Sequence, residues 1–196
     1  MRFLALATLV ALATSLTATA QDSLALGASV PLAGESFATA SGGSTSLSAE
    51  TGDSGLAVVF WSAACPWTAK YEARLAEIAQ TARANGIGMV LVASNDPDRS
   101  SGDTPEALAQ SAGRVGATLL LDPSARIADA FHAGQTPQAF FFDGGLLYSG
   151  AIDDSPAEAA RVTIAYLEQA IDQSLAGQAV EIGQTTPFGC TIKRAR

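Results

Sequence analysis

The stretch Leu56-Ala57-Val58-Val59-Phe60-Trp61-Ser62-Ala63-Ala64-Cys65-Pro66-Trp67 decides the fold of this sequence. It opens with an uninterrupted apolar run, which is typical of a strand buried on both faces. Ser62 ends the run, and Pro66 favours the first position of a helix. Apolar side chains then recur at helical spacing as far as Asn85-Gly86, a common helix stop. The sequence therefore predicts a buried strand, a short turn and a helix, with Cys65 at the junction.

Strand and helix patterns alternate along the rest of the chain. Apolar runs bounded by turn residues predict strands over 87–93, 117–121, 138–142 and 146–150. Capping and breaking residues predict helices over 104–113, 125–133 and 155–176, the last from a capping box that begins at Ser155. Segments 36–40 and 44–49 flank Gly42-Gly43 and predict a hairpin. This order predicts an α/β fold, with a mixed central sheet flanked by helices and an N-terminal hairpin extension.

The first 20 residues have the three parts of a secretory signal peptide. Arg2 supplies the positive charge, an apolar stretch follows, and a small-x-small site ends at Ala20. Cleavage there would leave one domain over 21–196, with a tail from about Gly177 that has no clear period. An uncleaved membrane anchor is the alternative, although the apolar run is short for a span. We therefore expect a periplasmic or secreted protein.

The charge and hydropathy of the sequence limit the kinds of partner that the protein is expected to bind. The formal net charge of −8 argues against nucleic acid and against anionic membranes, and no later segment predicts stable membrane insertion. The chain has two cysteines, Cys65 and Cys190, which is too few for a disulfide framework. In an oxidising compartment two thiols often pair if geometry allows. The sequence alone leaves that pairing open.

Cys65 is the residue best placed to carry chemistry. The N–H groups and dipole at a helix start favour an anion, so a thiol there loses its proton more readily and becomes nucleophilic. Lys70, about one helical turn further on, adds positive charge. The alternative is an inert buried cysteine, and position alone does not decide between the two.

Residues 60–68, Phe-Trp-Ser-Ala-Ala-Cys-Pro-Trp-Thr, resemble the active-site segment of the peroxiredoxin-like (redoxin) branch of the thioredoxin superfamily. Thr136-Pro137, before the Phe140-Phe141-Phe142 run, is similar to the cis-proline loop of that superfamily. The ending Phe-Gly-Cys-Thr-Ile-Lys at 188–193 resembles the tail of some redoxin-domain proteins. The resemblance implies a thioredoxin-like fold, a cis Pro137 that faces Cys65, and a Thr136 backbone free to pair with an extended substrate.

The sequence also departs from that pattern. Thr68 stands where thioredoxins have the second cysteine of Cys-x-x-Cys, so exchange within one motif is impossible. Ser62 fills the Thr/Ser place of peroxiredoxins, but Val58 stands where they have proline. Their catalytic arginine has no clear counterpart here. We therefore expect peroxide reduction to be weak.

These residues predict a thiol-based oxidoreductase. Cys65 would be the nucleophile and Ser62 a hydrogen-bond donor to the thiolate or a substrate oxygen. Thr136, Pro137 and Trp67 would line the substrate site. Substrates would be proteins or small molecules bearing thiols or disulfides, and an external thiol would be the reductant. No organic cofactor and no metal are implied.

Cys190 has two possible roles. It would either resolve a sulfenic acid or disulfide formed on Cys65, or be a structural thiol. The competing function is a non-catalytic module that binds a partner polypeptide at the Pro137 loop, with Cys65 vestigial or structurally paired.

Overall fold

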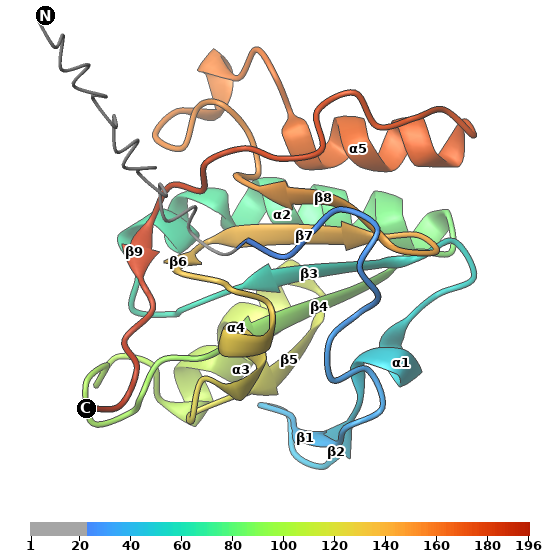
Figure 1. Cartoon of the computed structure of the whole chain (residues 1–196). Coiled ribbons are helices and arrows are strands. Elements are labelled where there is room, and N and C mark those ends of the chain that lie inside the picture. The colour runs from blue at the N-terminus through green and yellow to red at the C-terminus, as the bar shows by residue number, and fades with distance from the viewer. Residues whose placement is uncertain (1–22) are drawn as a thin grey trace, which may run out of the picture.

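The computed structural model describes residues 23–196, and the predicted signal segment lies outside them (Figure 1). In chain order its elements are β1 (Phe37–Ala38), β2 (Ser44–Thr45), α1 (Leu47–Glu50), β3 (Leu56–Phe60), α2 (Pro66–Ala84), β4 (Gly88–Ala93), α3 (Pro105–Val115), β5 (Thr118–Leu121), α4 (Arg126–Ala130), β6 (Gln135–Thr136), β7 (Gln138–Phe142), β8 (Leu146–Gly150), a 3-10 turn (Ala159–Arg161), α5 (Tyr166–Leu175) and β9 (Cys190–Thr191).

The central sheet has the strand order β5-β4-β3-β7-β8. β3 runs parallel to β4, and β4 runs parallel to β5, whereas β7 is antiparallel to both β3 and β8. All five residues of β3 are buried, because the strand lies in the middle of the sheet and is covered on both faces. The mixed sheet predicted from the strand patterns is confirmed.

Alternate residues of the central strands feed two hydrophobic cores. Val59 and Leu91 lie in the core on the side of α2, α3 and α5. Phe60 and Val92 point the other way, into the core that includes α1, α4 and the aromatic ring of Phe131. The period of two along each strand thus places helices on both faces of the sheet.

The N-terminal hairpin is present but shorter than predicted. β1 and β2 pair antiparallel through two residue pairs. The second strand ends early because Ser46 caps helix α1, its hydroxyl accepting from the Ala49 N–H at 3.1 Å. The local capping signal at Ser46 therefore overrides strand pairing in the following residues.

The predicted helix from Ser155 is wrong at its start, since α5 begins only at Tyr166. Arg74 of α2 accounts for the difference. Its guanidinium donates to the carbonyl oxygens of Ser155 and Pro156 at 3.1 and 3.3 Å, so these oxygens are taken by α2. No helix in the described part of the chain is long and apolar enough to cross a membrane.

Candidate redox site

The strand-to-helix junction is built as predicted. β3 ends at Phe60, and Cys65 occupies the cap position before Pro66, with an extended backbone. Thr68 fixes the intervening loop, because its buried hydroxyl lies 2.5 Å from the Ser62 carbonyl oxygen and 2.7 Å from that of Cys65. The residue in place of a second motif cysteine thus holds the turn that carries Cys65.

Cys65 and Cys190 form a disulfide across 125 residues of sequence. Their Cα atoms are 6.2 Å apart, a separation usual for a disulfide. Cys65 is only 3% exposed, whereas Cys190 is partly exposed. The pairing that the sequence left open is therefore made in the structure.

The C-terminal tail passes β8, an edge strand of the central sheet, before it reaches β9 beside β6 (Figure 1). Thr185 ties it to β8, with its N–H donating to the Ser149 carbonyl and its hydroxyl accepting from the Ala151 N–H at 2.9 Å. Beyond this anchor β9 pairs antiparallel with β6, and Ile192 is buried in the core on the α4 side. The tail is thus held on both sides of Cys190.

The Thr136–Pro137 peptide bond is cis, as the family resemblance implies, and it lies beside the disulfide. The Thr136 carbonyl oxygen is 3.2 Å from the Cys65 sulfur. In this oxidised state the Thr136 backbone pairs with Cys190 of the same chain, so its expected pairing with a substrate stays a prediction for the reduced protein. The tail, which has no periodic pattern of its own, occupies the place expected for a substrate.

Ser62 is held by a buried carboxylate. Its hydroxyl donates to both carboxylate oxygens of Asp103 at 2.9 Å, so in this oxidised state its proton is directed away from sulfur. Asp103 also accepts from the Ala64 N–H at 3.0 Å and from the Ser100 hydroxyl at 3.0 Å. Ser62 here positions the loop before Cys65, and its predicted role as a donor to thiolate or substrate stays a prediction for the reduced state.

Asn95 connects this carboxylate to the tail. Its side-chain N–H donates to Asp103 at 2.6 Å, and its side-chain oxygen accepts from the Lys193 N–H at 2.7 Å. The chain of hydrogen bonds therefore runs from the residue before Cys65 to the third residue after Cys190. Asn95 and Asp103 were not predicted as site residues. Their signal was a polar loop directly after a predicted strand, which proves to be parallel and ends where sites form in such sheets.

Trp67, in the first turn of α2, packs against Phe188, which lies two residues before Cys190 in the tail. Their rings meet edge to face, with centroids 4.7 Å apart. The Lys70 ammonium lies 5.9 Å from the Trp67 ring centroid. Trp67 was predicted to line a substrate site, and in the structure it contacts the aromatic residue of the protein's own tail.

The comparisons with known proteins agree with this geometry. The profile of the AhpC/TSA family matches residues 27–148, which include β3, Cys65 and the cis proline. The chain belongs to the AhpC/TSA family. No curated protein is significantly similar to it in sequence.

Solved structures place this AhpC/TSA family protein among thioredoxin-like folds. A hypothetical protein of Sinorhizobium meliloti 1021 is 30% identical over 89% of this chain and 97% of its own, with a TM-score of 0.79. An uncharacterized conserved protein of Geobacillus kaustophilus is 27% identical over 87% and 96%, with a TM-score of 0.74. A secreted disulfide oxidoreductase of Mycobacterium tuberculosis, homologous to E. coli DsbE, is 16% identical over 74% and 96%, with a TM-score of 0.51, and supports the fold alone.

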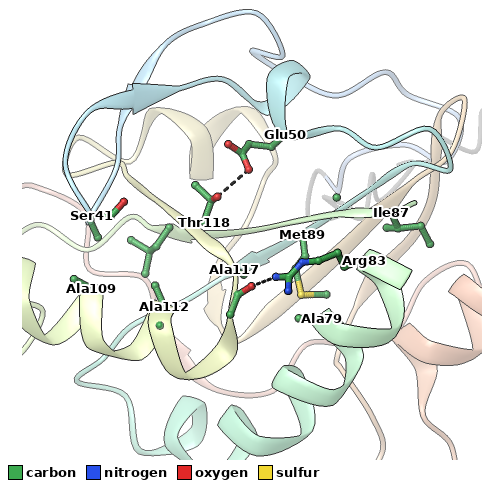
Figure 2. Close-up of a pocket in the computed structure, with 15 residues that line it drawn as sticks. Ser41, Glu50, Ala79, Arg83, Ile87, Met89, Ala109, Ala112, Ala117 and Thr118 are labelled. Atoms are coloured by element: carbon green, nitrogen blue, oxygen red, sulfur yellow. Dashed lines mark hydrogen bonds between the residues drawn. The ribbon is translucent and has the colours of Figure 1, made fainter. Parts of the chain in front are cut away.

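The protein also contains a cavity that lies away from the disulfide. It measures about 500 Å³ and lies beside the starts of β4 and β5 (Figure 2). Cys65 follows the opposite, carboxyl end of the parallel strand β3. Polar groups in the cavity are paired within the protein: Arg83 donates to the Gly116 carbonyl oxygen, and Thr118 donates to Glu50 at 2.8 Å. This cavity is separate from the redox site.

A smaller cavity adjoins the redox site itself. It measures about 150 Å³ and is mostly apolar, with Pro97, Pro105 and Leu108 in its wall. Asn95 and Asp103 supply its polar atoms. The polar network that links Ala64 to Lys193 therefore borders a small hollow at the carboxyl ends of β4 and β5.

Proposed function

We propose that this AhpC/TSA family protein is an exported thiol–disulfide oxidoreductase whose redox pair is Cys65 and Cys190. The observation that carries the proposal is the disulfide between a helix-start cysteine and a tail cysteine, beside the cis proline. Membership of a redox family and the thioredoxin-like fold support it. The signal-like N-terminus supports a periplasmic or secreted location.

In the reduced protein Cys65 is the nucleophile. Its thiolate attacks one sulfur of a substrate disulfide, forming a mixed disulfide and releasing the other substrate sulfur as a thiolate. Cys190 then attacks the Cys65 sulfur, so that the Cys65–Cys190 disulfide forms and the second substrate thiolate leaves. The positive end of α2, which begins at Pro66, stabilises the Cys65 thiolate.

An external thiol restores the reduced pair. Its thiolate attacks Cys190, the more exposed of the two sulfur-bearing residues, and Cys65 leaves as the better stabilised thiolate. A second external thiol resolves the mixed disulfide on Cys190. Two electrons thus pass from two external thiols to one substrate disulfide, with no organic cofactor and no metal.

Peroxide reduction is the slower branch of the same chemistry. The Cys65 thiolate would attack a peroxide oxygen, giving a sulfenic acid and water or an alcohol, and Cys190 would then form the disulfide with loss of water. Val58 in place of the family's proline supports a low rate. The engagement of the Ser62 hydroxyl by Asp103 supports it as well.

A non-catalytic binding module is the second candidate. It is favoured by the burial of Cys65 under the tail, which is the environment of an inert structural disulfide. In that case the disulfide would resist thiols until the protein unfolds.

Redox titration of the folded protein separates the two candidates. The mature protein is equilibrated with glutathione buffers, quenched with an alkylating agent and weighed by mass spectrometry. An oxidoreductase converts reversibly between the disulfide and dithiol forms while its near-ultraviolet circular dichroism remains native. A disulfide that opens only together with loss of native signal would establish the structural alternative. Intact mass of exported protein should show a chain that begins at Gln21.

A further inference from the structure

We propose that the groove now filled by residues 188–193 is a sequence-selective polypeptide site, and that the tail displays the segment it prefers. The inference rests on the proposed function. The preferred substrate is an extended segment with the order aromatic, glycine, cysteine, any residue, aliphatic. Its cysteine takes the place of Cys190 and exchanges with Cys65.

Main-chain pairing sets the register of the bound segment. Thr136 pairs with Cys190 and Gln135 with Thr191 in an antiparallel bridge (Figure 1). Beyond the bridge the Ile192 N–H donates to the Gly134 carbonyl oxygen at 2.9 Å. These contacts use backbone atoms of the tail, so any extended segment can make them, and they hold one cysteine opposite Cys65.

The position before the cysteine admits only glycine. A Cβ built on Gly189 would overlap the Thr136 carbonyl oxygen and lie 2.6 Å from its carbon and 3.0 Å from the Pro137 nitrogen. These are backbone atoms of the cis-proline segment, which cannot turn aside as the end of a flexible side chain can. The close approach thus selects against any side chain at this position.

The second position after the cysteine is a pocket for an aliphatic side chain. Ile192 is 3% exposed and belongs to the core that includes Phe60, Phe131 and Ala133. Thr191, between the cysteine and this residue, faces solvent. Alternation along the strand therefore makes one position selective and its neighbour permissive.

The second position before the cysteine meets an aromatic surface. Phe188 is 50% exposed, yet its ring packs edge to face on Trp67. A residue this exposed adds little to the stability of the core. An aromatic residue of the substrate would make the same contact with Trp67.

The tail can leave this groove from a fixed point. Thr185 stays tied to β8 through its backbone and hydroxyl, and the Tyr148 hydroxyl lies 2.6 Å from its Oγ1. The four residues that follow, 186–189, include Pro187 and have no regular structure before β9 begins at Cys190. Once the disulfide is reduced, only the non-covalent contacts of 188–194 keep the groove closed, and a matching segment competes for them.

The test uses full-length Cys190→Ser protein, in which Cys65 is the single thiol. The probe is the hexapeptide Phe-Gly-Cys-Thr-Ile-Lys carrying a thionitrobenzoate disulfide on its cysteine. Attack by Cys65 forms a protein–peptide disulfide and releases the coloured thiolate. Matched peptides carry alanine for glycine, aspartate for isoleucine, or serine for threonine. The double variant Gly189→Ala/Cys190→Ser uses the same steric overlap to expel the tail and open the groove.

We expect the parent peptide to react with Cys65 about tenfold faster than the alanine and aspartate peptides do. The serine peptide should react at the same rate as the parent peptide. The double variant should react faster than Cys190→Ser while keeping that order. If the double variant does not fold, the order of the four peptide rates on Cys190→Ser still shows whether the site is sequence-selective. Equal rates for all four peptides, with Cys65 reactive toward a small aryl disulfide, would overturn the inference and leave the proposed function standing. If Cys65 reacted neither with any of the four peptides nor with the aryl disulfide, the proposed function itself would be overturned.

Discussion

Cys190 stands directly opposite Thr136 in the pairing of β9 with β6, while its sulfur is bonded to Cys65. Two independent constraints, a backbone register and a covalent bond, therefore place the tail cysteine at the cis-proline edge. Reduction breaks the covalent bond and leaves the backbone pairing as the remaining constraint of the two. The behaviour of the reduced protein depends on how strongly the non-covalent contacts alone hold the tail.

Asn95→Leu should weaken the disulfide. The substitution keeps the approximate volume but removes the donor to Asp103 and the acceptor for the Lys193 N–H. Both cysteine-bearing segments then lose their shared hydrogen-bonding partner, so the effective concentration of Cys190 at Cys65 falls. We expect the equilibrium constant for disulfide formation against glutathione to drop by about tenfold, since lost buried hydrogen bonds cost about 1–3 kcal/mol.

Arg194→Gln is the matched control for Asn95→Leu. It removes an ion pair to Asp129 in which both side chains are more than a third exposed, together with one hydrogen bond to the Ala133 carbonyl oxygen. Exposed pairs contribute little, so the glutathione equilibrium should scarcely change. An equal shift in the two variants would mean that Asn95 acts only as one of many tail contacts.

Ile192→Ala should destabilise the oxidised protein more than the reduced protein. Removing a buried isoleucine side chain costs about 2–4 kcal/mol where its surroundings stay in place. In the oxidised chain the disulfide keeps the tail in place around the emptied site, so the free energy of unfolding falls by the full amount. In the reduced chain a tail that detaches no longer buries Ile192, and most of the cost disappears. Urea unfolding of both forms measures the difference.

The control for this comparison is Ile171→Ala in α5. Ile171 is 2% exposed and lies in the other core, remote from the tail cysteine. Ile171→Ala should lower the free energy of unfolding by the same amount in the oxidised and reduced proteins. If Ile192→Ala behaved in the same way, the reduced tail would be as firmly docked as the oxidised one.

Asp122→Asn should change how stability depends on pH. Burial raises the pKa of Asp122 above its usual range, although Ser94 and the first N–H groups of α4 donate to the carboxylate. The folded protein therefore binds this proton more tightly than the unfolded chain does. The contribution of the group is full below the unfolded pKa and is lost as pH rises through the folded pKa.

Wild type should accordingly lose stability relative to Asp122→Asn as pH rises from about 4 toward neutrality. Asparagine carries no charge at either end of that range, so the difference between the two proteins isolates the carboxyl group. Urea unfolding at a series of pH values, with the disulfide intact, gives the difference directly. A difference that grew in favour of wild type with rising pH would contradict a raised pKa.

Local patterns were enough to predict the framework of the site. The apolar run of β3, the proline at 66 and the cysteine between them form a strand, a turn and a helix whose order along the chain fixes where Cys65 lies. The cis Pro137 was predicted from a family resemblance, and it lies beside Cys65 as that resemblance implied.

Long-range contacts account for what the sequence could not predict. The tail has no period because each of its contacts is different: a bridge to β8, a disulfide, a two-residue strand and one buried isoleucine. The predicted helix start at Ser155 was wrong for a related reason, because Arg74 donates hydrogen bonds to the carbonyl oxygens of Ser155 and Pro156. Such partners lie far along the chain, and a local window does not contain them.

An external thiol should attack the disulfide at the Cys190 sulfur. Cys65 is 3% exposed and lies at the start of α2, where its thiolate is stabilised, whereas Cys190 is the more exposed residue. Attack on Cys190 therefore has both easier access and the better leaving group. Brief treatment of the oxidised wild type with glutathione, followed by acid quenching and peptide mapping, should find the mixed disulfide chiefly on Cys190. The single variants Cys65→Ser and Cys190→Ser, each loaded with glutathione, supply reference masses for the two positions. Predominant labelling of Cys65 in the wild type would reverse the assignment, and would require the tail to open before the external thiol arrives.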